Sequence, residues 1–169
     1  MLHPTARVHP TARVHPSAEI GEGVVIGART SIWARAVVDR GSQVGSDCVI
    51  GREAYVDGAE VGNECKIENG AYIPPGVHLE SEVFVGPFAK FANDRYPRAT
   101  AAEGEAPFVP AGARVCRGAS IGMGALIGAE VTIGKGAMIG MGAIVPKDVA
   151  EGATVYGPKT PHTPESTES

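Results

Sequence analysis

The stretch IGMGALIGAEVTIGKGAMIGMGAIV, residues 121–145, repeats an isoleucine followed by a glycine every six positions. Ile121, Ile127, Ile133 and Ile139 are each followed by glycine, and Val145 continues the same six-residue spacing. A period of six fits neither an α-helix, with about 3.6 residues per turn, nor the simple alternation of a strand. Each repeat is therefore a short strand followed by a tight turn, and three repeats close one triangular coil.

The same period runs through most of the chain, with one residue lost after Val56 and a longer gap after Phe91. The aliphatic or aromatic positions are Val8, Val14, Ile20, Ile26, Ile32, Val38, Val44, Ile50, Val56, Val61, Ile67, Ile73, Leu79, Val85, Phe91, Val109, Val115, Ile121, Ile127, Ile133, Ile139 and Val145. Small or slender residues recur four positions after most of these, and the exceptions are Glu60 and Arg95. This double pattern predicts an all-β fold, a parallel β-helix of about seven coils over residues 1–157.

Composition excludes several classes of function. The 15 Lys and Arg residues and 19 Asp and Glu residues give a net charge of −4, which provides no strong field for nucleic acid or an anionic membrane. The first residues lack the order of a secretory signal, so we expect a cytoplasmic protein. Cys48 and Cys65 both occupy the small-residue pattern and are expected to stack inside the coils as reduced thiols.

Both patterns fail between Phe91 and Val109, so residues 92–108 are expected to leave the coils as a loop. Loops on a rigid scaffold commonly carry binding and catalytic groups. Residues 158–169 are rich in Ser, Thr, Glu and Pro, and we expect a disordered tail there.

The pattern aliphatic-Gly-x-x-small-x resembles the hexapeptide-repeat acyltransferases over residues 8 to 157. The resemblance implies a left-handed parallel β-helix, a rare exception to right-handed crossovers, and a homotrimer.

The segment Phe91-Ala92-Asn93-Asp94-Arg95-Tyr96-Pro97-Arg98 is similar to a motif, Phe-Thr-Asn-Asp-x-Tyr-Pro-Arg, of one subgroup. That subgroup acetylates the 3-amino group of nucleotide-linked sugars, for example on routes to O-antigen. The resemblance therefore implies acetyl transfer from acetyl-CoA to a nucleotide-linked amino sugar. The substrate-binding residues that it implies are Asn93, Asp94, Arg95, Tyr96 and Arg98.

The chemistry of these residue types suits acetylation of an amine. The Asn93 amide can hold an amine or polarise a thioester carbonyl, and arginines can bind carboxylate or diphosphate oxygens. A free amine hardly needs a strong base, so direct attack is expected, with Asn93 and His78 as the candidate catalytic residues. The alternatives are that Asn93 and Asp94 form a simple turn and that His78 is an ordinary surface residue.

Acetyl-CoA is expected to lie between neighbouring C-terminal coils, where small residues allow the pantetheine arm to approach the backbone. The candidate cofactor-binding residues are Ser120, Gly122, Ala125, Ala143 and Lys147. No metal is expected.

Two other functions remain open. A zinc carbonic anhydrase on the same fold would need about three His ligands, and residues 38–90 offer only His78. A non-catalytic trimeric scaffold is also compatible with the fold.

Overall fold

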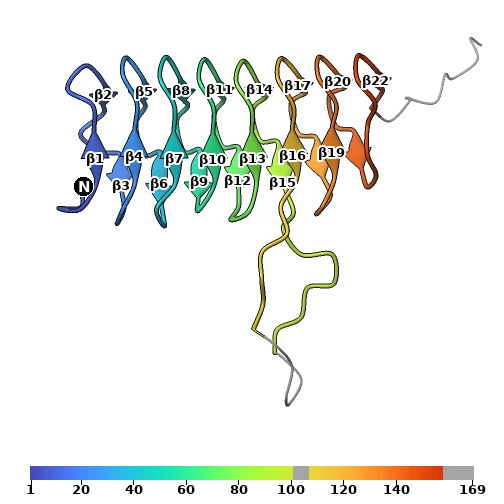
Figure 1. Cartoon of the computed structure of the whole chain (residues 1–169), viewed down its shortest axis with the longest axis horizontal. Coiled ribbons are helices and arrows are strands. Elements are labelled where there is room, and N and C mark those ends of the chain that lie inside the picture. Colours follow the sequence, from blue (N-terminus) through green and yellow to red (C-terminus); the bar gives the residue numbers. More distant parts are fainter. Residues whose placement is uncertain (101–106, 158–169) are drawn as a thin grey trace, which may run out of the picture.

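The computed structural model describes residues 1–100 and 107–157, which form a parallel β-solenoid with three flat faces (Figure 1). The predicted all-β parallel helix is confirmed. Residues 101–106 of the predicted loop and the predicted tail, residues 158–169, lie outside the described residues. The sheets contain seven, eight and seven strands, so the solenoid has about eight turns rather than the seven expected.

We name the three sheets face 1, face 2 and face 3, in the order in which the chain visits them. Face 1 contains β1 (Arg7–Val8), β4 (Val25–Ile26), β7 (Gln43–Val44), β10 (Glu60–Val61), β13 (His78–Leu79), β16 (Arg114–Val115) and β19 (Thr132–Ile133). Face 2 contains β2 (Arg13–Val14), β5 (Ser31–Ile32), β8 (Val49–Ile50), β11 (Lys66–Ile67), β14 (Phe84–Val85), β17 (Ser120–Ile121), β20 (Met138–Ile139) and β22 (Thr154–Val155). Face 3 contains β3 (Glu19–Ile20), β6 (Val37–Asp39), β9 (Tyr55–Asp57), β12 (Tyr72–Ile73), β15 (Lys90–Phe91), β18 (Leu126–Ile127) and β21 (Ile144–Val145).

The core consists of the two residue patterns seen in the sequence. Each strand pairs in parallel with the strand one coil away, as in the pair Ile121 and Ile139, so that like residues stack inside the prism. Two positions differ from the expectation. Ala59, which is 2% exposed, takes the inward place expected for Glu60, because the shortened turn shifts the small residue by one position. Val109 is 78% exposed and lies in no strand.

The predicted stacking of Cys48 and Cys65 is confirmed. Both thiols are buried and free of disulfides, and they occupy successive coils of face 2. Hydrogen bonding with the neighbouring Cys48 thiol, and then burial, raise the pKa of Cys65, so this thiol fills the core in its neutral form.

Charged side chains join successive coils at the corners. Arg29 and Asp47 both have positive φ angles, of 57° and 59°, and their side chains form an ion pair of 2.6 Å. Hydrogen bonding from Arg29 lowers the pKa of Asp47. The same stacking brings Arg35 to Glu53.

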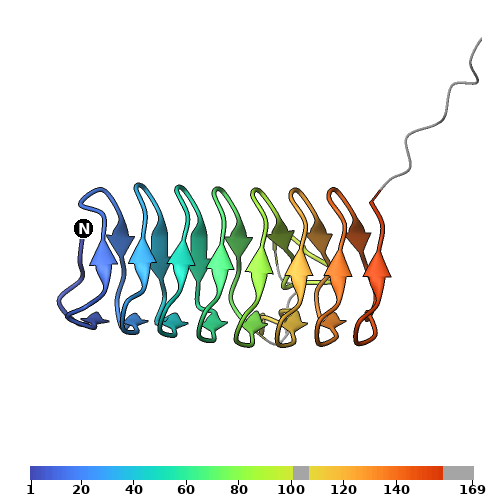
Figure 2. The same ribbon diagram turned by 90° about the horizontal axis from the view of Figure 1, so that it is seen from above.

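The prism is elongated, and its first and last coils lie at opposite ends (Figure 2). A long loop leaves its side between β15 and β16 (Figure 1). Within residues 1–100 and 107–157 there is no apolar helix of the length needed to cross a membrane.

Candidate active site

The loop leaves the prism at the corner where each face-3 strand turns into the next face-1 strand, which we call the loop corner. At its neck, the Ala111 N–H donates to the Asn93 carbonyl oxygen at 3.0 Å, and the Glu130 N–H donates to the Ala111 carbonyl oxygen at 3.0 Å. Gly112 packs so closely on the coil below that a Cβ atom there would lie 2.3 Å from the backbone of Gly76. The neck is therefore held firmly by backbone contacts.

The Asn93 side chain is part of this neck. Its amide nitrogen donates to the Pro75 carbonyl oxygen at 3.2 Å, which ties the loop to the turn that leads into β13. This bond occupies one donor and leaves the carbonyl oxygen of the amide for other partners. The expected catalytic role of Asn93 stays a prediction. The structure adds a second role, in which its side chain holds the neck of the loop against the turn at Pro75.

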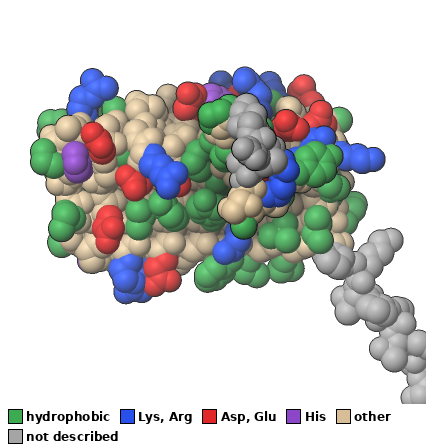
Figure 3. All heavy atoms as spheres, turned by 90° about the horizontal axis from the view of Figure 1, so that it is seen from below, with side chains coloured by type: hydrophobic (Ala, Val, Ile, Leu, Met, Phe, Trp, Pro, Cys, Tyr) green, Lys and Arg blue, Asp and Glu red, His purple; other side chains and the backbone are tan. Residues whose placement is uncertain are grey.

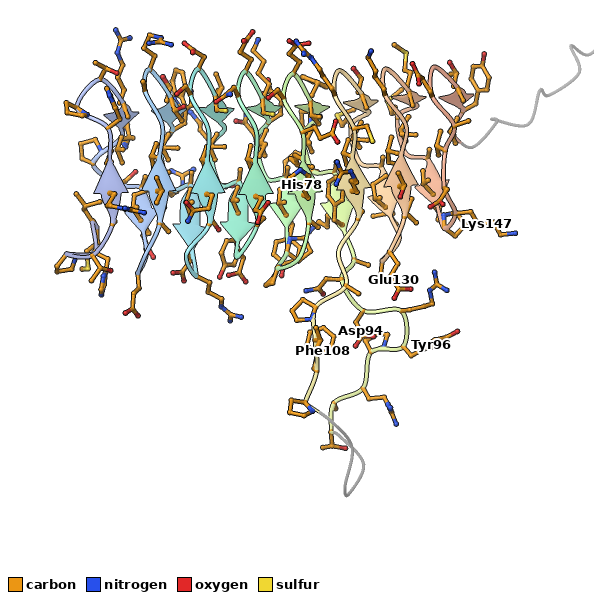
Figure 4. The ribbon with its side chains drawn as sticks, in the orientation of Figure 1. His78, Asp94, Tyr96, Phe108, Glu130 and Lys147 are labelled. Atoms are coloured by element: carbon orange, nitrogen blue, oxygen red, sulfur yellow. The ribbon has the colours of Figure 1, made fainter. Side chains whose placement is uncertain are left out.

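Asp94 follows the turn interpretation that the sequence left open. Its carboxylate accepts a hydrogen bond from the Tyr96 N–H at 2.8 Å, the geometry of an Asx turn. Tyr96 is 77% exposed, and Arg98 is exposed on the same part of the loop. Figure 4 shows Asp94 and Tyr96 on the loop, away from the prism.

Arg95 points back to the prism and forms an ion pair of 3.3 Å with Glu130. Both side chains line a groove of about 420 Å³ that also includes Lys147 and Asp148. Asp148 accepts a hydrogen bond from the Thr132 N–H at 2.8 Å, whereas Lys147 has no ion-pair partner among the residues that the structure describes. The groove thus unites a predicted substrate-binding residue with a predicted cofactor-binding residue, and its Lys147 ammonium is available to an anion.

His78 lies on face 1 in β13, three residues after Pro75, and is half-buried (Figure 4). Its Nδ1 atom is 2.8 Å from a carboxylate oxygen of Glu60 in the coil before it. Reasoning from the sequence missed this partner, because Glu60 stood out there only as a break in the pattern. The separation of 18 residues, one full coil, is the sequence signal that would have identified it.

Arg114 follows the loop and pairs with His78 in the next coil of face 1. Its guanidinium donates to Glu80, which also accepts the Arg117 N–H at 2.9 Å. These hydrogen bonds, first that from Arg117 and then that from Arg114, lower the pKa of Glu80. The acidic side chain is therefore held as an anion beside His78.

A buried carboxylate lies at the loop corner two coils before the loop. Asp57 is 4% exposed, and its Oδ1 atom accepts no hydrogen bond from any described residue, although the Arg40 Nε atom lies 3.2 Å away. Burial raises the pKa of Asp57; Arg40 acts against this, and Asp39 in the neighbouring coil adds to it.

The predicted cofactor-binding residues do not form one site within a single chain. Ala125 and Ala143 are 0% and 1% exposed and belong to the core, so at these positions only the backbone can meet a cofactor, and their expected role stays a prediction. Ser120 lies on face 2 and Gly122 at the turn after it, whereas Lys147 lies at the loop corner.

The zinc alternative requires a cluster of ligand side chains. Across residues 1–100 and 107–157, no group of three or more His, Cys, Asp or Glu side chains is arranged to hold a metal ion.

Comparisons with known proteins agree with the fold. A family model described as the GMPPB C-terminal domain matches residues 2–92. The acetyltransferase domain of PglB from Neisseria gonorrhoeae, solved with acetyl coenzyme A, is 23% identical, with a TM-score of 0.51 over 90% of this chain. The chain spans 55% of the length of that structure.

A second solved structure is a point mutant of AntD, an N-acyltransferase from Bacillus cereus, in complex with dTDP and coenzyme A. It is 17% identical with a TM-score of 0.52, and the match covers 90% of this chain and 78% of that one. At these identities the two structures establish the shared fold alone. No curated protein sequence matches the chain.

Proposed function

The chain belongs to the family of the GMPPB C-terminal domain, and we propose that it is an acyltransferase that moves acetyl from acetyl-CoA to the amine of a nucleotide-linked amino sugar. The observation that carries the proposal is the loop corner, where Glu60 and His78 lie beside the neck of the loop and Arg95 and Lys147 line one groove. The proposed acceptor is a 3-amino sugar, by the resemblance of residues 91–98. The solenoid is proposed to be left-handed, like those of the hexapeptide-repeat acyltransferases.

In the proposed reaction the free amine attacks the thioester carbonyl carbon. The new C–N bond forms, the C–S bond breaks, and the CoA thiolate leaves. A carboxylate can only accept hydrogen bonds, so Glu60 fixes the proton of His78 on Nδ1 and leaves Nε2 to accept the proton that the amine loses. Lys147 would bind a phosphate of one of the two substrates.

Fold relatives support the same chemistry. PglB was solved with acetyl coenzyme A, and AntD with dTDP and coenzyme A, or with dTDP-4-amino-4,6-dideoxyglucose and coenzyme A. A CoA thioester and a nucleotide-linked amino sugar are thus the substrate classes proposed for this chain.

We further propose a homotrimer. Large apolar side chains stay exposed on faces 2 and 3 and the turn between them, towards the C-terminal end: Phe84, Phe88, Met123, Leu126, Met138, Met141 and Ile144. Figure 3 shows apolar side chains gathered beside the loop and along one edge of the C-terminal half. A patch of this kind on a folded chain is typical of an interface. Light scattering should give about 52 kDa, three chains of 17.4 kDa, and a stable monomer would contradict this arrangement.

The test of function is release of CoA thiol and a mass increase of the sugar. Acetyl-CoA is incubated with UDP- and dTDP-linked amino sugars, and with the matching sugars that carry a hydroxyl group instead. Product with amine acceptors supports the proposal, and no product with any of them contradicts it. Binding of acetyl-CoA should also raise the melting temperature.

Transfer to a hydroxyl group is the second candidate function, because the hydrogen bond between Glu60 and His78 suits a general base. Product with the hydroxyl sugars alone would favour it over amine transfer.

A further inference from the structure

The N-terminal half of face 2 carries a hollow of about 450 Å³ that the proposed reaction does not use. It is lined by residues of β5, β8 and β11 and of the turns that follow them. Figure 1 shows these strands on the side of the prism opposite the loop. Its volume lies within the usual range for small-molecule sites, roughly 300–1,000 Å³.

Trp33 forms one wall of the hollow. It is the only tryptophan in the chain and is 47% exposed. The guanidinium carbon of Arg52 lies 5.9 Å from the centroid of its ring, so a cation is already held against the indole. Part of the large apolar ring remains in contact with solvent, where a planar ligand can cover it.

Two cations converge on the same hollow. Arg52 and Lys66 both line it, and neither has a carboxylate partner among the described residues. The backbone N–H of Arg52 donates to the side-chain oxygen of Asn69 at 2.8 Å. This hydrogen bond fixes the Asn69 side-chain amide and leaves its nitrogen free to donate. Glu68 contributes one negative charge, so the hollow stays positive by one unit.

We propose that this hollow binds a nucleotide. The base stacks on Trp33, because every nucleobase offers a planar ring to an exposed indole. The phosphates lie against Arg52 and Lys66, since guanidinium and ammonium groups are the side chains that bind phosphate oxygens. An aromatic wall beside two cations matches a planar base joined to phosphates better than it matches a simple sugar or an apolar chain.

Two substrates of the proposed reaction contain this chemistry: the nucleoside diphosphate of the amino sugar and the adenosine phosphates of CoA. Because the hollow and the loop lie on opposite sides of one prism, a substrate bound here can reach only the loop of another copy. The inference deepens the proposed function and rests on it, but nucleotide binding is measured without any acyl transfer, so the two can fail separately.

The experiment follows the fluorescence of Trp33 in the full chain, excited at the red edge of the indole band, where nucleotides absorb little. UDP, dTDP and adenosine 3′,5′-bisphosphate are titrated separately, with calorimetry as a second readout. We expect saturable quenching by at least one nucleotide. Quenching by UDP or dTDP alone identifies the sugar nucleotide as the source, and quenching by the adenosine bisphosphate alone identifies CoA.

Variants test the residues. Arg52→Ala and Lys66→Ala should each weaken binding by roughly tenfold, the value of one lost charged hydrogen bond. Arg7→Ala on face 1 is the control for removal of an exposed arginine and should leave binding unchanged. Calorimetry on Trp33→Leu should show much weaker binding. The proposal is overturned by the absence of any signal at millimolar nucleotide, by unchanged binding in the Arg52→Ala, Lys66→Ala double variant, or by equal affinity for inorganic pyrophosphate.

Discussion

The Nδ1 atom of His78 lies 2.8 Å from a carboxylate oxygen of Glu60, one coil before it on face 1. Both side chains are partly open to solvent, with exposed fractions of 41% and 69%. Because a carboxylate only accepts hydrogen bonds, the contact places the proton of a neutral His78 on Nδ1 and leaves Nε2 able to accept one. A base is therefore available beside the loop, and the rate of a His78 variant decides between direct attack by a free amine and attack assisted by a base.

His78→Ala should lower kcat for an amine acceptor by less than about tenfold, because the amine attacks as the free base and loses its proton afterwards. Where a general base is needed it contributes about 10²–10⁴ in rate. The measurement is kcat across pH for wild type and variant, with Glu60→Gln as the control that keeps a hydrogen-bond acceptor for Nδ1. A loss within the range of an essential base would contradict direct attack.

Asn93→Ala should lower kcat by about 10²–10³, the usual cost of one fixed polar contact at the reacting atoms. The same change removes the hydrogen bond to the Pro75 carbonyl oxygen, so the position of the loop has to be examined separately. Asp94→Ala, which removes only the bond to the Tyr96 N–H, is the matched control for a loosened loop. Equal losses of kcat in the two variants, with the KM for the sugar unchanged in Asp94→Ala, would mean that Asn93 acts only by holding the loop.

Gly112→Ala should destabilise the neck strongly, because the new Cβ atom would lie 2.3 Å from backbone atoms of the coil below. Gly124→Ala is the comparison: its φ of +65° strains an alanine, but nothing lies within 4 Å of the Cβ position, so the cost should stay near about 1–2 kcal/mol. Thermal melting and kcat of both variants provide the test. A Gly112→Ala protein as stable and as active as Gly124→Ala would show that the backbone of the neck can move to make room for the Cβ atom.

Asp57→Asn should raise the melting temperature at neutral pH. The pKa of Asp57 is raised in the folded chain, so the folded state binds more protons than the unfolded state over the interval between the two pKa values. The stability that protonated Asp57 contributes is therefore fully present below the pKa that Asp57 has in the unfolded chain. It is lost as the pH rises through the pKa that Asp57 has in the folded chain. Melting curves from mildly acidic to neutral pH should be flatter for the variant, and a parallel or steeper curve would contradict this sign.

Lys147→Ala should raise the KM for acetyl-CoA or for the nucleotide sugar and leave kcat nearly unchanged, because a phosphate contact binds the ground state and the transition state alike. Lys135→Ala, at an exposed corner of another edge of the prism, controls for loss of one positive charge. Equal changes in the two variants would exclude Lys147 from either substrate site.

The repeat predicted the solenoid because each inward position is filled by the same kind of residue. Val109 shows where this reasoning ends: it has the right spacing, but it precedes the neck of the loop and is 78% exposed. The six-residue spacing cannot be counted across an inserted loop, because the length of the loop is independent of the repeat. It therefore does not tell which residue begins the next coil. The neck itself resumes the pattern at Ala113 and Val115, which are both buried.

The site was predicted in part. The break in the repeat placed Asn93 and Arg95 on the loop, and the resemblance supplied only their expected roles, which stay predictions. The structure adds that Arg95 and Lys147 line one groove. The ion pair of Arg114 and Glu80 could not be foreseen, because the two residues are 34 apart and the loop between them has no fixed length. Small residues such as Ala125 have two explanations, close approach of a cofactor to the backbone and packing inside the core, and the structure shows that the second applies to the side chain.

Each strand pairs only with strands one coil away, so every completed coil is the template for the next. On the ribosome, the coils up to Phe91 can assemble before the loop has been synthesised. Until each following coil arrives, however, the growing end presents an unpaired strand edge and an open apolar interior to other nascent chains. The loop separates Phe91 from the sixth strand of face 1, so the coil that ends at Phe91 stays uncovered for longer during synthesis than coils followed directly by the next strand.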